Sequence, residues 1–387
     1  MLPIRQPVHD LPPPSAEAQS HSERLRTLIR AEIEAAAGGI SFERYMELAL
    51  YAPGLGYYSA GARKFGAVGD FITAPEVSPL FARCLARQCA EVLTAIGGGH
   101  ILELGAGSGV MAADLLAELE RLGRLPERYL ILEVSAELRE RQQVLLAKRM
   151  PQWREHITWI ERLPQSFSGV ILGNEVLDAL PVERFRRGAK DFEQFVVVDD
   201  GDGFAWDTRS APLLLQRMLV ALEVALPGGF PPGYISEICP RLPAFMASLG
   251  DTLARGALLL LDYGYPRAGY YHADRAMGTL LCHYRQRAHD DPFRFVGLQD
   301  ITAHVDFTAT AEAAVAAGLE LAGYTTQAHF LLALGIAAEA GDWRQAREVK
   351  LLTLPQEMGE RFKAIAFTRS LAVPLRGFAL RDLAHTL

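Results

Sequence analysis

Short apolar runs alternate with amphipathic segments from residue 100 onward, and this alternation constrains the fold more than any other feature of the chain. A run of four to eight apolar residues bounded by turn residues is typical of a buried strand. The strand candidates are HILEL, YLILEV, ITWI, GVILG and, further on, GALLLLDYG. Because strands that alternate with helices build a parallel sheet covered by helices, the sequence predicts an α/β fold.

The segments around this alternation predict how the chain is divided. A tail rich in Pro, Ser and Ala comes first, and a first helix is expected from Ser22 to Ala37. The runs ERFRR and FEQFVVVDD have a period near two, which predicts a small β excursion inserted in the α/β unit. The expected regions are a flexible tail over 1–20, a mainly helical region over 21–97, the α/β domain over 98–330 with its β excursion at about 182–208, and a helical C-terminal region over 331–387.

Charge and composition exclude several classes of protein. The 387 residues include 39 Lys and Arg against 46 Asp and Glu, so a net charge of −7 gives no electrostatic reason to expect a nucleic-acid partner. No apolar run reaches the length that spans a bilayer, and the first residues lack the apolar core of a secretory signal. The four cysteines form no CxxC pair and the histidines show no ligand spacing, so no metal is expected. We expect a cytoplasmic bacterial protein.

A glycine-rich loop follows the first predicted strand. It reads Glu103-Leu-Gly105-Ala-Gly107-Ser-Gly109, and a helix follows it. Glycines let the backbone turn tightly and approach a ligand, and the helix start offers unpaired N–H groups. Val110 stands where the dinucleotide-binding fingerprint requires its last glycine. The pattern instead resembles the first motif of class I S-adenosylmethionine-dependent methyltransferases, which have a Rossmann-like sheet; the alternative is a tight strand–helix turn without a ligand.

Acidic and polar residues end the next strands. Glu133 ends the second strand, where a carboxylate can accept hydrogen bonds from both hydroxyls of a ribose. Nicotinamide-dinucleotide folds use the same device, and a solvated surface acid is the plain alternative. Asn174 and Glu175 end the fourth strand, with Asp178 following, at the expected mouth of the cleft. These three residues can also be read as the cap and first turn of a helix.

Several segments together resemble the MidA-like family of S-adenosylmethionine-dependent methyltransferases. They include YAPGLGYYS, GDFITAPEVSPLFARCLA, ILELGAGSG, LEVSAELRERQ, GNEVLDALPVERF, LLLDYGY and LQDITAHVDFTA, in this order. The resemblance covers the chain from about Tyr45 to Phe367. It implies S-adenosyl-L-methionine as cofactor and a loop, containing Phe71, that closes over it. The cofactor-binding residues that it implies are Gly69, Asp70, Thr73, Pro75, Glu103, Gly105, Gly107, Ser108, Gly109, Glu133, Val134, Ser135 and Asn174.

The same family resemblance implies an acceptor. Its mitochondrial members are described as protein-arginine methyltransferases that assist assembly of respiratory complex I, which makes a complex I subunit the expected protein substrate. A guanidinium is a poor nucleophile that needs carboxylates around it, and Glu175, Asp178 and Asn174 are the candidate catalytic residues. Further acids and a histidine are offered by Glu237, Asp262, Asp300, His304 and Asp306. A small-molecule acceptor, an assembly factor without turnover, and homo-oligomerisation all stay open.

Overall fold

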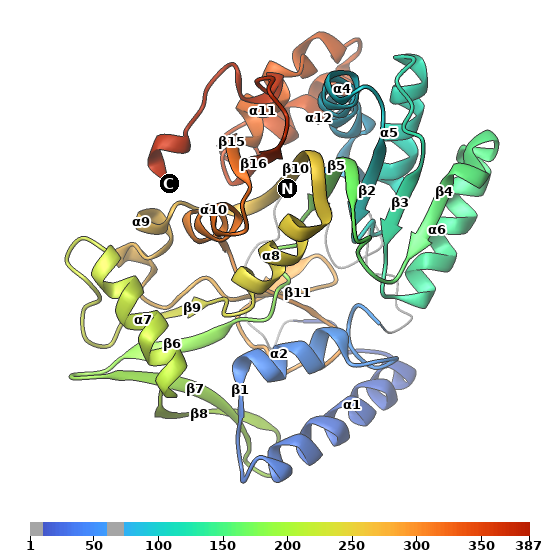
Figure 1. Cartoon of the computed structure of the whole chain (residues 1–387). Helices are drawn as coiled ribbons and strands as arrows, with labels where there is room; N and C mark the ends of the chain where they lie inside the picture. Colours follow the sequence, from blue (N-terminus) through green and yellow to red (C-terminus); the bar gives the residue numbers. More distant parts are fainter. Residues whose placement is uncertain (1–10, 60–72) are drawn as a thin grey trace.

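A central sheet organises the molecule (Figure 1). The structure is a computed structural model that describes residues 11–59 and 73–387. Within these residues the sheet has the order β15-β16-β10-β5-β2-β3-β4, with β14 beside β10. Its strands are β2 (His100–Leu104), β3 (Tyr129–Leu132), β4 (Ile157–Ile160), β5 (Phe167–Asn174), β10 (Leu253–Tyr265), β14 (Val305–Asp306), β15 (Glu320–Thr326) and β16 (Phe362–Arg369).

The middle of this sheet is parallel, which confirms the predicted α/β fold. Strands β10, β5, β2, β3 and β4 run in one direction. The register pairs Leu104 with Gly173 and with Leu132, and Leu261 with Asn174. The carboxyl ends of four strands therefore meet at one edge, which is where open parallel sheets bind their ligands.

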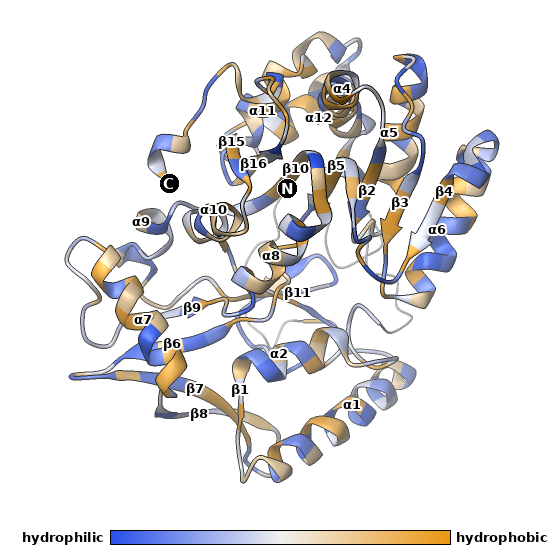
Figure 2. Ribbon diagram, in the orientation of Figure 1, coloured by the Kyte–Doolittle hydropathy of each residue, from blue (hydrophilic) through white to orange (hydrophobic). Residues whose placement is uncertain are grey.

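Helices bury both faces of the sheet. Leu259 and Leu261 of β10 pack in one apolar cluster, while Leu258 and Leu260 pack in another, so the strand reads as a continuous apolar run (Figure 2). The first cluster includes α4, α5 and α11, and the second includes α8 and α10. The helices of this part are α4 (Pro79–Ile96), α5 (Val110–Arg121), α6 (Ala136–Arg149), α8 (Leu242–Thr252), α9 (Arg267–Tyr270), α10 (Phe307–Ala316), α11 (Gln327–Ala333) and α12 (Trp343–Thr353).

A second, antiparallel sheet carries the N-terminal helices beneath the carboxyl edge of the first (Figure 1). Helices α1 and α2 pack on this sheet through buried residues such as Leu25, Phe42 and Tyr45. These elements are α1 (Ala16–Ala35), β1 (Ile40–Ser41), α2 (Phe42–Tyr51), β6 (Glu183–Arg187), β7 (Phe192–Asp199), β8 (Phe204–Ser210), α7 (Leu213–Ala225) and β9 (Ile235–Ile238). The inserted β excursion thereby brings the N-terminal region to the edge of the main sheet.

Smaller elements complete the described chain. The three-stranded sheet has the order β12-β11-β13. None of the helices in the described part of the chain is long and apolar enough to cross a membrane. The elements are α3 (Ala74–Val77), β11 (Leu281–Tyr284), β12 (Arg287–His289), β13 (Asp300–Thr302) and 3-10 turns at Pro151–His156, Ala273–Arg275, Ile336–Glu339, Arg376–Phe378 and Ala384–Thr386.

The first helix begins earlier than the sequence predicts. It runs over Ala16–Ala35, so residues 16–20 of the expected tail are helical, and the helix ends two residues before Ala37. Ser15 is the N-cap, and its side chain accepts a hydrogen bond from the backbone N–H of Ala18 at 3.2 Å. Capping by Ser15 stabilises a helix start that the Pro- and Ser-rich composition obscured.

The C-terminal region contains a strand as well as helices. The main sheet therefore extends beyond residue 330, where the α/β domain was expected to end. Strand β16 (Phe362–Arg369) lies between β10 and β15 and runs antiparallel to both. All its residues except Arg369 are buried. A strand covered on both faces has no alternation of apolar and polar residues, so its period does not separate it from a buried helix.

Candidate functional site

Three glycines turn the chain between β2 and α5. Gly105, Gly107 and Gly109 have φ values of 60°, 54° and 81°, in the left-handed region that glycine enters without strain. The N–H of Gly105 donates to the carbonyl of Leu132 at 3.0 Å, which ties the loop to the end of β3. The loop therefore presents backbone rather than side chains to whatever lies above it.

A cavity of about 330 Å³ opens above this loop, at the carboxyl edge of β2, β3 and β5. Of the residues singled out from sequence, the structure places on its wall Thr73, Pro75, Glu103, Gly105, Gly107, Ser108, Glu133, Val134, Asn174, Glu175, Asp178 and Asp300. Gly109 and Ser135 lie off the wall, as the N-caps of α5 and α6. Gly69, Asp70 and Phe71 lie outside the described residues.

Glu133 is held in a fixed orientation. Its side chain is only 6% exposed, and its two oxygens accept hydrogen bonds from the N–H of Ser135 at 2.9 Å and from Nε2 of Gln142 at 3.0 Å. Gln142 also donates to the carbonyl of Gly107 at 2.9 Å, and Nε1 of Trp159 donates to its Oε1 at 2.8 Å. Gln142 thus links the glycine loop to Glu133, a role that the sequence analysis missed because Gln142 lies inside α6.

Two further contacts fix the walls around the loop. The hydroxyl of Ser108 donates a hydrogen bond to Glu76 of α3. This contact places the segment that begins at residue 73 against the glycine loop. The hydroxyl of Tyr129 donates to Glu103 at 2.6 Å. Burial raises the pKa of Glu103 to about 7, although the Tyr129 hydrogen bond opposes that rise. Thr73 is the N-cap of α3, but its side chain makes no capping hydrogen bond.

Glu175 follows β5 in an unusual backbone conformation. Its φ is 54°, a region that costs a non-glycine residue free energy and that is seen most often at functional sites. Its N–H donates to the carbonyl of Leu261 at 2.8 Å, and Nδ2 of Asn174 donates to its Oε1 at 3.1 Å. Burial, together with the neighbouring Asp178, raises the pKa of Glu175 to about 8. Turns follow, not a helix, so these residues do not act as a helix cap.

Asp262, near the carboxyl end of β10, holds the turn that follows β5 in place. One of its oxygens accepts the backbone N–H groups of Val176, Leu177 and Asp178 at 3.1, 2.9 and 3.2 Å. Asp262 is fully buried, and its burial beside Asp178 and Glu175 holds its pKa well above the usual range. Asp262 does not line the cavity, so the structure makes it a positioning residue for the turn.

Asp178 presents a buried oxygen without a partner. The hydroxyl of Tyr263 donates to its Oδ2 at 2.6 Å, while its Oδ1 has no hydrogen-bond partner within the described part of the chain. The residue is 6% exposed, and burial raises its pKa to about 6. A buried acceptor without a donor is costly unless a ligand supplies the donor. Oδ1 of Asn174 is buried and unpaired in the same way.

Two tyrosines from the N-terminal region complete the wall. The rings of Tyr51 and Tyr58 are stacked, with centroids 5.5 Å apart. The Tyr58 hydroxyl donates to Oδ1 of Asp300 at 2.9 Å, and the Tyr51 hydroxyl donates to the carbonyl of Ala179 at 2.9 Å. Hydrophobic periodicity does not predict a role for these tyrosines, and the segment YAPGLGYYS that contains them points to the site only through its family resemblance.

The wall is strongly acidic. Its described residues include six carboxylates and no Lys, Arg or His, the carboxylates being Glu76, Glu103, Glu133, Glu175, Asp178 and Asp300. Because burial raises the pKa of Glu103, Glu175 and Asp178 to about 7, 8 and 6, part of this wall is protonated near neutral pH, and the cavity favours a cationic ligand more strongly as the pH rises. The other acids and the histidine offered by the sequence lie elsewhere: Glu237, His304 and Asp306 line a separate cavity.

Comparison with known proteins agrees with this geometry. Residues 84–325 match the family model of putative S-adenosyl-L-methionine-dependent methyltransferases. A protein from Burkholderia thailandensis that is described as a likely methyl transferase, solved with S-adenosyl-homocysteine bound, is 44% identical; the match covers 98% of this chain and 100% of that one, with a TM-score of 0.92. The zebrafish protein arginine methyltransferase NDUFAF7, mitochondrial, is 28% identical over 368 residues, covering 85% of this chain and 83% of that protein. Its Caenorhabditis elegans homologue is 26% identical.

The α/β fold and these matches therefore define a methyltransferase with a Rossmann-like sheet. The chain belongs to the family of S-adenosyl-L-methionine-dependent methyltransferases whose model it matches, and S-adenosyl-L-methionine is its cofactor.

Proposed function

We propose that this enzyme methylates the guanidinium of an arginine in a protein substrate. The observation that carries the proposal is Asp178, whose buried Oδ1 has no donor in the described chain, in a cavity that holds six carboxylates and no described cation. A guanidinium supplies both the missing N–H donors and the missing positive charge. The naming of the NDUFAF7 relatives as protein arginine methyltransferases supports the same acceptor.

We propose that one half of the cavity holds the cofactor. The left-handed glycines leave room beside the backbone, Glu133 is oriented for a diol, and the unpaired Oδ1 of Asn174 is an acceptor for an amino group. When bound, S-adenosyl-L-methionine supplies the methyl group on a sulfonium, and no metal is needed for its displacement. Thr73, Pro75, Ser108 and Val134 line the same half, while Gly69 and Asp70 of the expected covering loop lie beyond the described residues.

We assign the acceptor half to Glu175, Asp178 and Asp300, with the rings of Tyr51 and Tyr58 beside them. Carboxylates fix the plane of a guanidinium and draw its charge away from the nitrogen that attacks. Methylation of a guanidinium nitrogen conserves the group's charge, so one proton must leave that nitrogen. Glu175 has a raised pKa of about 8 and is matched to accept that proton near neutral pH.

The protein nature of the acceptor rests on the relatives and not on the cavity. Both named relatives are mitochondrial protein arginine methyltransferases, and the match covers most of each. By resemblance to the MidA-like family, we propose a respiratory complex I subunit as the protein substrate.

The proposal is tested by labelled methyl transfer into a lysate of a strain that lacks the gene, followed by mass spectrometry of the labelled species. Methylated arginine in a protein is the expected product, and Asp178→Asn should reduce transfer by roughly a hundredfold or more while binding of S-adenosyl-homocysteine survives. Asp207→Asn, on β8 away from the cavity, is the matched control. Label in a small molecule would contradict the proposal. Cofactor binding without any transfer would favour an assembly factor.

A further inference from the structure

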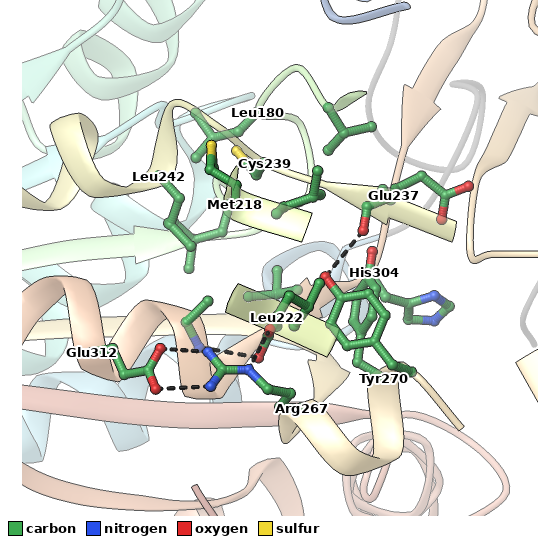
Figure 3. A pocket seen from close by; sticks show the side chains of 18 of the residues that line it. Leu180, Met218, Leu222, Glu237, Cys239, Leu242, Arg267, Tyr270, His304 and Glu312 are labelled. Carbon is green, nitrogen blue, oxygen red and sulfur yellow. Dashed lines mark hydrogen bonds and ion pairs between the residues drawn. The ribbon is translucent and has the colours of Figure 1, made fainter. Parts of the chain in front are cut away.

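Two features of the described chain lie outside the residues assigned to the cofactor and the acceptor. One is a cavity of about 410 Å³ among α7, β9 and α10 (Figure 3). Arg267 of this cavity is already paired with Glu312 and, at 3.6 Å, with Asp306, so its charge identifies no ligand. The other feature is Gln142 of α6, which is fully buried and does not line the cavity above the glycine loop, yet contacts two parts of its wall.

The side chain of Gln142 joins the glycine loop to Glu133. Its Nε2 donates to the carbonyl of Gly107 at 2.9 Å and to Oε2 of Glu133 at 3.0 Å. The N–H of Ser135 donates to Oε1 of the same carboxylate at 2.9 Å. Because one donor holds each oxygen, the plane of the Glu133 carboxylate is fixed before any ligand arrives.

Gly109 makes room for this contact. A Cβ atom at Gly109 would lie 3.2 Å from Cγ of Gln142 and 3.4 Å from its Cα, which is too close for an unstrained fit. The absence of a side chain at residue 109 therefore lets α6 approach the loop. The third glycine of the loop, which lies off the cavity wall, thus accommodates Gln142.

Trp159 of β4 determines which way the Gln142 amide points. The indole N–H can only donate, and it donates to Oε1 of Gln142 at 2.8 Å, which turns the NH₂ group toward Gly107 and Glu133. A half turn of the amide would set its oxygen against a carbonyl and a carboxylate, and its NH₂ against the indole N–H. Each of the three hydrogen bonds would then become a repulsion, so one orientation of the amide is strongly favoured.

We propose that Gln142, oriented by Trp159, is a positioning residue that holds Glu133 ready for the ribose hydroxyls of the cofactor. The inference rests on the assignment of Glu133 to the ribose in the proposed function. A carboxylate that is already oriented loses less conformational freedom when it accepts these hydroxyls. Gln142 should therefore strengthen binding of the ribose without touching it, and its effect should disappear when the hydroxyls are absent.

The probes are S-adenosyl-homocysteine and its analogue that lacks both ribose hydroxyls, each titrated calorimetrically into the full chain. The parent should bind the analogue roughly a hundredfold more weakly. Gln142→Met keeps the length of the side chain and removes the amide, so it should weaken S-adenosyl-homocysteine about tenfold and leave the analogue unchanged. Trp159→Phe leaves Gln142 in place and should lower the discrimination between the two ligands about threefold, which tests the inference even if Gln142→Met does not fold.

Two matched controls make the same chemical changes elsewhere. Gln143→Met alters an exposed residue of α6 off the cavity wall, and Trp153→Phe removes an indole N–H that donates to Glu120 at 3.4 Å. Both should discriminate between the ligands as the parent does.

The outcomes separate this inference from the proposed function. Discrimination equal to the parent's in Trp159→Phe or in Gln142→Met would overturn the inference, and so would equal weakening of both ligands, which indicates a merely structural role. A parent that binds both ligands equally well would show that Glu133 does not hold the ribose. The assignment of the cofactor half would then fail together with this inference, while the arginine acceptor would still be tested by methyl transfer.

Discussion

Replacement of Glu175 by Gln tests whether the proposed acceptor pocket needs a negative charge at this position, because the change removes the charge and keeps the shape of the side chain. Glutamine keeps the size of the side chain, and the backbone conformation is fixed independently by the Leu261 hydrogen bond and by Asp262 below the turn. The variant should therefore fold and bind S-adenosyl-homocysteine as the parent does. What it loses is the carboxylate that we assign to binding the guanidinium and accepting its proton.

The pKa of Glu175 gives the magnitude and its dependence on pH. With a pKa of about 8, roughly one molecule in ten carries an ionised Glu175 at pH 7, and about nine in ten at pH 9. A cationic acceptor binds the ionised form, so its apparent affinity should rise about tenfold between pH 7 and pH 9. The raised pKa sets the sign: the productive form is present above pH 8 and is lost as the pH falls. Glu175→Gln should abolish this rise and lower kcat/KM at pH 9 by roughly a hundredfold.

The assay is calorimetric binding of N-acetyl-L-arginine amide to the S-adenosyl-homocysteine complex from pH 6 to pH 9, beside single-turnover methyl transfer to an arginine peptide. S-adenosyl-homocysteine has no sulfonium, so a positive charge on the cofactor does not influence the measured affinity for the arginine ligand. A flat profile in the parent, or transfer by Glu175→Gln at the parent rate, would show that Glu175 holds no guanidinium. Asp178 would then be the remaining acid with an unpaired oxygen.

The remaining predictions concern the cofactor half, the aromatic wall and the buried acids. Gly107→Val places a β-branched residue at a φ of 54° on the cavity wall, and calorimetry should detect little S-adenosyl-homocysteine binding. Glu133→Ala should weaken that binding by about 2–4 kcal/mol without unfolding the protein; unchanged affinity would place the ribose elsewhere. Tyr58→Phe keeps the ring but removes the hydroxyl that binds Asp300, so the acceptor KM should rise about tenfold while S-adenosyl-homocysteine affinity is unchanged. Because the pKa of Glu103 is raised to about 7, the folded protein binds more protons than the unfolded chain, and the free energy of unfolding should fall as pH rises from about 4.5 to 7; denaturant titrations of Glu103→Gln should show a shallower fall.

The sequence by itself determined the parallel core and the loop above it. Runs such as HILEL and GVILG are short, apolar and bounded by glycines, and they became β2 and β5 as predicted. The glycines at 105, 107 and 109 predicted a tight turn, and the structure places all three in the left-handed region that glycine enters without strain. Since the carboxyl ends of parallel strands share an edge, the sequence also placed Glu133, Asn174 and Glu175 near one another.

Only the tertiary structure decided what surrounds those residues. Tyr51, Tyr58 and Asp300 reach the cavity from the N-terminal helical region and from β13, and Gln142 joins two motifs from within a helix. Strand β16 lies in a segment that the sequence predicted to be helical. The prediction failed because a strand that is buried on both faces lacks the alternation of apolar and polar residues that marks a strand. Contacts between segments hundreds of residues apart have no period in the sequence, so the fold alone determines which acids meet in the cavity and which, like Glu237 and Asp306, line its neighbour.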